Sequence, residues 1–407
     1  MKYDPLIHPT SVFERFHKSL NSIKYIGQSA KLKLLNIKDK HINDKRNILF
    51  VLKLKTFIIY YLISNCEDNI SINNITLPFT SSEPLSIILS RGSGVESEHL
   101  VDIALSDSKG KLIISIGDMD RIVYPRSATK LFQCLALASF DPEVTQKEYS
   151  VICSSHNGQK EHVEVVQKFL EKNNLLQNDL ICTAHWSLEK NIFINQVRKY
   201  EEPPKLLSNC SGKHSGMLLL SKLLNTDSKG YETLEHPVQK RIIEIINYLS
   251  GQNILEFPFG VDGCGVPAFS APIKVWAKAF ASFANSKDLS DELKKGKELI
   301  SNAIYNEPLL IAGERRICTA IARDLGDKIT PKMGAEAVYC CSLNDTGLGL
   351  VLKCRDGSRR AVEFALGKIF SLLNYKISKV LNKHFDPNIY NLSGKKIGLK
   401  EARLNRS

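Results

Sequence analysis

Two turn signals far apart in the chain constrain the fold most. Ser106–Gly110 separates the apolar stretches Leu100–Leu105 and Lys111–Ile116, and Asp356-Gly357 follows the apolar run 348–354. Short polar turns that contain glycine and lie between apolar segments are typical of β-hairpins. We therefore predict antiparallel strands in two distant regions of the chain, with a hairpin at each turn signal.

The sequence between these regions repeats its apolar residues at helical spacing. Apolar residues that recur every three to four positions indicate amphipathic helices. This periodicity predicts helices over Ala128–Ala138, His162–Phe169, His214–Leu224, Pro237–Leu249, Ile273–Phe283 and Ser301–Ile304. An antiparallel sheet made from both ends of the chain, flanked by the helices of its middle, is an α+β fold.

Composition divides the chain into three parts. Residues 1–83 are rich in Lys, Asn and Ile and have no clear turn signals between apolar segments, so we predict an N-terminal extension of unknown role. We predict the main domain over residues 84–390, where the strand and helix patterns lie, and a basic tail over 391–407.

The net charge of +12 does not predict nucleic-acid binding. Residues 1–80 contain 12 Lys and Arg against 6 Asp and Glu, so half of the excess lies in the N-terminal extension. No RNP, KH, zinc-finger or basic-zipper pattern accompanies this charge. We therefore expect no nucleic-acid partner.

Apolar patterning also argues against a membrane protein. The longest apolar stretch, Ile48–Ile63, is interrupted by Lys53 and Lys55 and is shorter than the roughly 18 to 20 apolar residues that a span needs. The first residues include Asp4 and lack the apolar segment of a secretory signal. We expect a cytoplasmic protein without a membrane partner, in which the ten cysteines stay reduced.

Two lysine motifs are candidates for nucleophilic chemistry. Ser127 and Lys130 stand at a predicted helix start, and their spacing places hydroxyl and amine on one face. A partly desolvated lysine can accept the proton of a serine. Lys332 and Gly334 form a later Lys-x-Gly, and this order of motifs is typical of serine penicillin-recognising enzymes. The alternative for Ser127 is a helix N-cap beside a solvated lysine.

Three loops carry further candidate groups. Ser155 lies in "CSSHNGQ", where an apolar segment runs into a predicted helix, and an ordinary helix start explains this loop as well. Cys210 and Cys264 lie beside glycines in "NCSGKHSGM" and "DGCGVP", without the Cys-x-x-Cys pairs of structural zinc sites. A metal site with Lys213 or His214 as third ligand and a pair of buried free thiols both fit this pattern.

Together these motifs resemble the L-asparaginase II family, the rhizobial-type or class 3 asparaginases, whose fold is similar to that of serine β-lactamases and penicillin-binding proteins. The resemblance runs from about Arg91 to Arg360. It rests on RGSGVESEH, PRSATK, CSSHNGQ, NCSGKHSGM, DGCGVP, KMGAEAV and LVLKCRDGSRRA. The chain departs from the family pattern at Ala337, where the family usually has glycine, and in the charged stretch around Arg316.

The resemblance implies a homodimeric enzyme that hydrolyses L-asparagine to L-aspartate and ammonia by acyl transfer. It also implies one zinc ion per chain near the substrate. By motif, the catalytic residues are Ser127, Lys130, Ser155 and Lys332, the substrate contacts are Arg126, His214, Asp262, Gly334 and Ala335, and the zinc ligands are Cys210, Lys213 and Cys264. The alternatives are a glutaminase or β-lactam hydrolase of the same fold, and a catalytically silent zinc-stabilised protein that binds amino acids.

Overall fold

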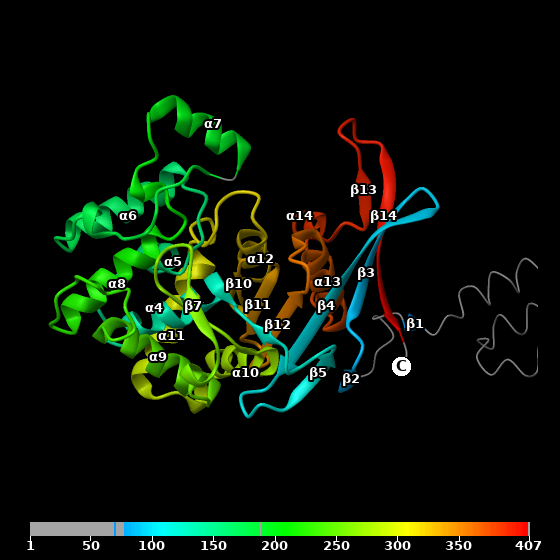
Figure 1. The fold of residues 1–407 in the computed structure, drawn as a ribbon, viewed down its shortest axis with the longest axis horizontal. Coiled ribbons are helices and arrows are strands. Elements are labelled where there is room, and N and C mark those ends of the chain that lie inside the picture. The colour runs from blue at the N-terminus through cyan, green and yellow to red at the C-terminus, as the bar shows by residue number, and fades with distance from the viewer. Residues whose placement is uncertain (1–68, 71–76, 188, 406–407) are drawn as a thin grey trace, which may run out of the picture. The chain divides into compact units, whose positions relative to one another are not determined.

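An antiparallel sheet organises the chain, and the computed structural model describes it over residues 69–70, 77–187 and 189–405 (Figure 1). The path through the main sheet is β1 (Asn69–Ile70), β14 (Lys396–Asn405), β3 (Leu85–Arg91), β4 (Gly94–Ser106), β12 (Leu348–Cys354), β11 (Val338–Leu343) and β10 (Ile329–Met333). Off this path, β13 (Asn388–Tyr390) pairs with β14, while β5 (Leu112–Ile116) is antiparallel to β4 and parallel to β2 (Phe79–Ser81).

The pairing of β4 with β12 joins the two regions in which we predicted strands. Ser106 lies opposite Gly349 and Val101 opposite Cys354, in antiparallel register. The hairpin predicted at Ser106–Gly110 is confirmed, because β4 and β5 pair on either side of it. The α+β arrangement, with an antiparallel sheet flanked by helices, is therefore confirmed.

Helices fill the chain between β5 and β10 and follow β12. They are α4 (Lys130–Ala138), α5 (Gln146–Ile152), α6 (Lys160–Lys172), α7 (Lys190–Lys199), α8 (Ser211–Leu223), α9 (Pro237–Ser250), α10 (Ile273–Ala284), α11 (Asp291–Asn306), α12 (Ile317–Leu325), α13 (Arg359–Leu372) and α14 (Lys379–Asn382). All six predicted helices are present, and three of those missed are α5, α7 and α12. Among the described residues, no helix is long and apolar enough to cross a membrane.

Local sequence explains where the helices begin and end. At α9, the His236 side chain accepts a hydrogen bond from the Val238 amide, Pro237 takes the first helical position, and Gly251 ends the helix at a φ of 67°. At α5, Thr145 and Glu148 form a capping box. Such signals are local, so they set boundaries without regard to the rest of the fold.

The second predicted hairpin is wrong. Asp356-Gly357 does follow β12, but it leads into α13 rather than into another strand. The Asp356 carboxylate accepts a hydrogen bond from the Ser358 amide, which turns the chain toward the helix. After this turn, apolar residues return at helical spacing, and Ala361, Ala365 and Ile369 are all buried in α13.

The observed boundaries also differ from the predicted division of the chain. The segment predicted as a basic tail contains β14, which pairs with β3 inside the main sheet, for example at Ala402 and Ile87. Phe79–Ser81, assigned to the extension, pairs with β5. These strands were missed because their residues lie between polar and basic ones. Most of the predicted extension, residues 1–68 and 71–76, lies outside the described residues.

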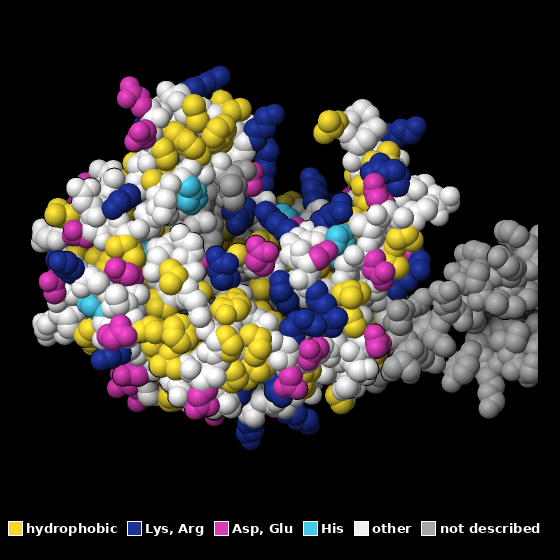
Figure 2. All heavy atoms as spheres, in the orientation of Figure 1, with side chains coloured by type: hydrophobic (Ala, Val, Ile, Leu, Met, Phe, Trp, Pro, Cys, Tyr) yellow, Lys and Arg dark blue, Asp and Glu magenta, His cyan; other side chains and the backbone are white. Residues whose placement is uncertain are grey.

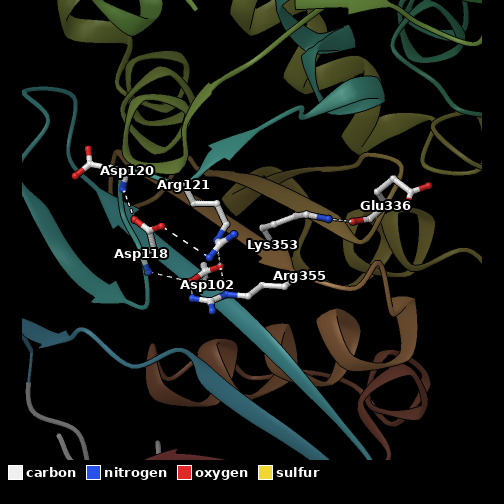
Figure 3. A network of polar contacts seen from close by, with 7 residues as sticks. All are labelled: Asp102, Asp118, Asp120, Arg121, Glu336, Lys353 and Arg355. Carbon is white, nitrogen blue, oxygen red and sulfur yellow. Dashed lines mark hydrogen bonds and ion pairs between the residues drawn. The ribbon is translucent and has the colours of Figure 1, made fainter. Parts of the chain in front are cut away.

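A buried carboxylate ties β4 to two neighbouring segments (Figure 3). Asp102 is fully buried and accepts hydrogen bonds from Arg355 Nε at 2.9 Å and Nη2 at 2.8 Å. Arg121 Nε lies 2.8 Å from Asp102 Oδ2, and the Asp118 amide donates to Oδ1 at 2.9 Å. On the face in Figure 2, Lys and Arg side chains gather over this part of the sheet. The network therefore fixes the loop that leads from β5 toward Ser127.

Candidate active site

The turn that carries Ser127 is held from several sides. Ser127 lies in the short 3-10 helix η2 (Arg126–Thr129), which runs directly into α4. The fully buried Trp276 of α10 donates from Nε1 to Val123 O at 3.0 Å, just before the turn. Arg126 has a φ of 53°, a left-handed conformation that costs a non-glycine residue about 1 to 3 kcal/mol. Such strain next to a candidate nucleophile is typical of functional sites.

The end of β10 packs against the same turn. A Cβ on Gly334 would lie 2.1 Å from Pro125 O, so only glycine permits this approach. The Gly334 amide donates to Val338 O at 2.9 Å, so this amide is not free for the substrate contact that the resemblance implies at Gly334. Ala337, where the family usually has glycine, has a φ of 52°, which explains that preference for glycine.

Ser155 lies between the two candidate lysines. Its Oγ is 2.9 Å from Lys332 Nζ and 3.2 Å from Lys130 Nζ. Both lysines are almost completely buried, with exposed fractions of 1% and 2%. One hydroxyl thus contacts two amines from different elements, β10 and α4, and can pass a proton between them.

Lys130 is directed toward Ser155, away from its motif partner Ser127. In addition to Ser155, its Nζ donates to Ser154 O at 2.6 Å and to Asn209 O at 3.1 Å. Among the described residues, none of the hydrogen bonds of this amine goes to the Ser127 hydroxyl. The Ser-x-x-Lys spacing therefore brings both residues to one site without pairing them directly.

Lys332 has the properties of a base. Burial, together with the charge of Lys130, lowers the pKa of Lys332 to about 7, because both disfavour a second ammonium at this place. Apart from Ser155, its amine donates to Met333 O at 3.1 Å. An amine with a pKa near neutrality that contacts a serine hydroxyl can accept its proton.

Arg126 and Asp262 form an ion pair at the edge of the site. Arg126 Nε and Nη2 donate to Asp262 Oδ1 at 2.9 and 2.5 Å. Burial alone would raise the pKa of Asp262, but the hydrogen bond from Arg126 and the charge of Lys213 outweigh it and lower that pKa. Both side chains keep unused polar atoms, so each can still bind a substrate group.

A small pocket lies beside these residues. Its lining contains the predicted catalytic residues Ser127 and Lys130 together with the predicted substrate contacts Arg126 and Asp262. The lining residues are Arg126, Ser127, Thr129, Lys130, Gln133, Lys213, Asp262, Pro267, Ala268 and Phe269. The candidate nucleophile, the two charged substrate contacts and one predicted zinc ligand therefore line the same narrow recess.

His214 is fully buried in α8 and held by a residue that the sequence did not single out. Its Nδ1 lies 2.7 Å from the hydroxyl of Tyr231, which also accepts a hydrogen bond from the Ile181 amide. Burial, with the charges of Lys213 and Lys130, lowers the pKa of His214 well below its ordinary value. The buried Nε2 has no partner among the described residues. No spacing pattern around Tyr231 pointed to this role.

The three predicted zinc ligands converge. Lys213 Nζ lies 2.8 Å from Cys264 Sγ, and the Cys210 and Cys264 thiols are hydrogen-bonded to each other. That bond, with the charges of Lys130 and Lys213, lowers the pKa of Cys210 well below its ordinary value although burial opposes it. Two sulfurs, one of thiolate character, are ligands that suit zinc, and the Lys213 amine, which is not an ordinary zinc ligand, can complete the set once it loses its proton. The residues present therefore fit the metal.

Comparisons with solved structures find only partial overlaps. Mglu in its native form shares 15% identity over 67% of this chain, with a TM-score of 0.37, and the match spans 63% of the Mglu chain, less than two thirds of its length. A β-lactamase candidate from Bacteroides dorei shares 10% over 72% of this chain and 95% of its own, with a TM-score of 0.38. A D-alanine carboxypeptidase from Burkholderia cenocepacia shares 11% over 67% and 93%, with a TM-score of 0.28.

Comparison with protein families gives a clearer result. No curated protein matches the chain. The profile of L-asparaginase II matches residues 87–402, which include the Ser127 turn, Ser155, the Cys210 and Cys264 loops and Lys332. This match covers most of the chain and every motif that carried the resemblance. The chain belongs to the L-asparaginase II family.

Proposed function

We propose that this chain is an L-asparaginase that hydrolyses L-asparagine to L-aspartate and ammonia through an acyl-enzyme on Ser127. One observation carries the proposal. Ser155 contacts both Lys130 and the base Lys332, next to a pocket that Ser127 shares with the Arg126–Asp262 pair. Family membership supports an amide as the substrate class.

Substrate binding follows from the charges in the pocket. Arg126 can bind the α-carboxylate of an amino acid, and Asp262 can bind its α-ammonium group. Their mutual ion pair at 2.5 Å keeps both charges in place before substrate arrives. His214 Nε2, which is buried and has no partner within the described part of the chain, can donate a hydrogen bond to the substrate. These contacts orient the side-chain amide over Ser127.

Proton transfer follows from the contacts of Ser155. Ser127 attacks the amide carbon as its proton moves to Lys130, and Lys130 gives up one of its own protons through the Ser155 hydroxyl to the neutral amine of Lys332. The proton returns to the leaving nitrogen, and ammonia departs. Water then hydrolyses the β-aspartyl ester of Ser127 with the same groups as base and acid.

Zinc is the cofactor that we propose for this site. Cys210, Lys213 and Cys264 would hold it, and when bound it supplies positive charge near the substrate pocket. Cys210 and Lys213 lie at the start of α8, which also carries His214, and Cys264 lies in the loop 262–264 with Asp262. The ion would therefore also fix the positions of two substrate contacts.

The direct test is ammonia release by the purified chain from L-asparagine, L-glutamine and D-asparagine. We expect L-asparagine to be hydrolysed with the highest kcat/KM, by about 10-fold or more over L-glutamine, because one methylene is worth about 1 to 3 kcal/mol in a tight pocket. Higher activity on L-glutamine would make the chain a glutaminase. Binding of L-asparagine without ammonia release would make it an amino-acid-binding protein.

The pH dependence of the reaction should follow Lys332. Below pH 7 this lysine is protonated and cannot accept a proton, so kcat/KM is expected to rise as pH increases through about 7 and then to level off. A pH profile of initial rates measures this. Lys332→Arg, which is charged at every pH tested, is the matched variant and should lose at least about 100-fold in kcat/KM. A wild-type profile that is flat between pH 6 and pH 8 would exclude Lys332 as the base.

Metal content provides a separate prediction. In Cys210→Ala, zinc is expected to fall by one equivalent per chain relative to the wild type, because a buried thiolate ligand is lost. Elemental analysis of the desalted proteins measures this, and Cys134→Ala, another buried cysteine, is the control. Equal zinc in Cys210→Ala and in the control would show that Cys210 is not a ligand.

A further inference from the structure

A second cluster of metal-ligand side chains lies at a different place in the sheet. It consists of His99 on β4, Cys354 at the end of β12 and Asp356 in the turn before α13. Their ligand atoms all lie within 4.8 Å of one another. We propose that His99, Cys354 and Asp356 form a second zinc site.

The distances require only small movements to bind an ion. His99 Nδ1 lies 2.5 Å from Asp356 Oδ2, and Cys354 Sγ lies 3.0 Å from Asp356 Oδ1. Ligands that surround zinc tetrahedrally at about 2.0 to 2.3 Å are roughly 3.3 to 3.8 Å apart. A shift of less than about 1 Å at the Asp356 carboxylate therefore opens the space for the ion.

Neighbouring groups already orient two of the three ligands, His99 and Asp356. Ser97 Oγ lies 3.2 Å from His99 Nε2 and also accepts a hydrogen bond from Arg360 Nη2 at 3.3 Å. With its proton on Nε2 and donated to Ser97, His99 presents the lone pair of Nδ1 to the ion. The Asp356 carboxylate is held by the Ser358 amide at 2.9 Å. Binding releases the thiol proton of Cys354, breaks the hydrogen bonds that Asp356 accepts from His99 and Cys354, and leaves the remaining imidazole proton of His99 on Nε2.

Burial determines how the ion reaches the site. Cys354 is fully buried and His99 is 8% exposed, whereas the Asp356 side chain is 49% exposed. The ion therefore enters from the Asp356 side, where water can complete the tetrahedral coordination. A sulfur, an imidazole nitrogen and a carboxylate oxygen favour zinc over magnesium or calcium, which prefer oxygen ligands alone.

The site lies close to the rim of the proposed active site. A Cβ on Gly357 would lie 2.9 Å from Glu336 Oε2, so the turn of Asp356 packs on Glu336. Glu336 lines a cavity that also contains Arg126. An ion at Asp356 would thus stiffen a turn that borders the substrate side, although its binding does not depend on the proposed function.

Zinc titration of the full chain in a Cys210→Ala background tests the proposal. Metal is first removed with a chelator, and Zn²⁺ is then added in competition with a colorimetric zinc indicator. We expect the Cys210→Ala protein to bind one equivalent of zinc per chain. Adding Cys354→Ser should weaken this binding at least about 100-fold, while adding Cys341→Ser, a change at another buried cysteine of the sheet, should leave it unchanged.

Two further variants keep the test decisive if Cys354→Ser does not fold. Asp356→Asn changes an exposed side chain, and Ser97→Ala removes the partner of His99; each should weaken binding about 10- to 100-fold. With Co²⁺ in place of Zn²⁺, the background protein should show thiolate-to-cobalt absorption that Cys354→Ser lacks. A background protein that binds no zinc, or variants that bind it like the control, would overturn the proposal. Ammonia release is measured separately, so either proposal can fail alone.

Discussion

Replacement of Ser127 by alanine is expected to lower kcat for L-asparagine hydrolysis by at least about 1,000-fold, because the acyl group then has no oxygen to bind. The pocket should still bind substrate, since Arg126 and Asp262 make their ion pair without the Ser127 hydroxyl. Steady-state ammonia release and asparagine binding measure the two effects. Ser139→Ala, at the other end of α4, is the matched control and should retain wild-type activity.

Ser155→Ala separates the roles of the two serines. We expect a loss of about 100- to 10,000-fold, because Lys130 and Lys332 lose the hydroxyl that connects them. Acylation should still occur on Ser127 in this variant, and mass spectrometry of the quenched enzyme can locate the acyl group. An acyl group on Ser155 in the wild type, or more than a tenth of wild-type activity in Ser127→Ala, would reverse our assignment.

Replacement of Asp102 by alanine is expected to lower the free energy of unfolding by about 3 to 5 kcal/mol. The Asp102 carboxylate is fully buried. Its removal leaves the partly buried side chains of Arg355 and Arg121 without the carboxylate that both contact (Figure 3). Such a loss exceeds the effect of most substitutions because a partly buried charge loses its counter-ion. Urea unfolding of wild type and variant measures it, provided that both have the same m-value.

An exposed carboxylate in the loop that carries Asp118 and Arg121 gives the control for this effect. Asp120 pairs with Lys274 at 2.5 Å, but its side chain is 76% exposed. Ion pairs in solvent contribute about 0 to 1 kcal/mol, so Asp120→Ala should change the unfolding free energy by no more than that. If Asp102→Ala costs as little as Asp120→Ala, the buried network does not stabilise the fold.

The fold was largely predictable because its signals are local. Periodicity predicted helices such as α9 and α10, and the hairpin between β4 and β5 followed from a polar turn with glycine. The prediction of a second hairpin was wrong because an Asp-Gly pair allows a tight turn before a helix as readily as before a strand. The strand β14 was missed because its lysines and arginines interrupt the alternation of apolar and polar residues that is typical of a strand.

The sequence motifs predicted which residues lie close together, but not which of them hydrogen-bond to one another. The motif spacing placed Ser127 and Lys130 on one face, yet the buried amine of Lys130 is directed to Ser155 and to backbone carbonyls. Spacing cannot report which acceptors a long side chain finds in three dimensions. Tyr231, which holds His214, lies in a stretch without any motif, so only the structure reveals it.

The joining of β4 to β12 has a consequence for how the chain folds. These strands pair across more than two hundred residues of intervening sequence, for example at Ser106 and Gly349, and contacts of such long range are slow to form. The helices α4, α8 and α9 pack on one another within that interval. We expect the helical part to acquire hydrogen-exchange protection first during refolding, and the closure of β4 on β12 to limit the rate.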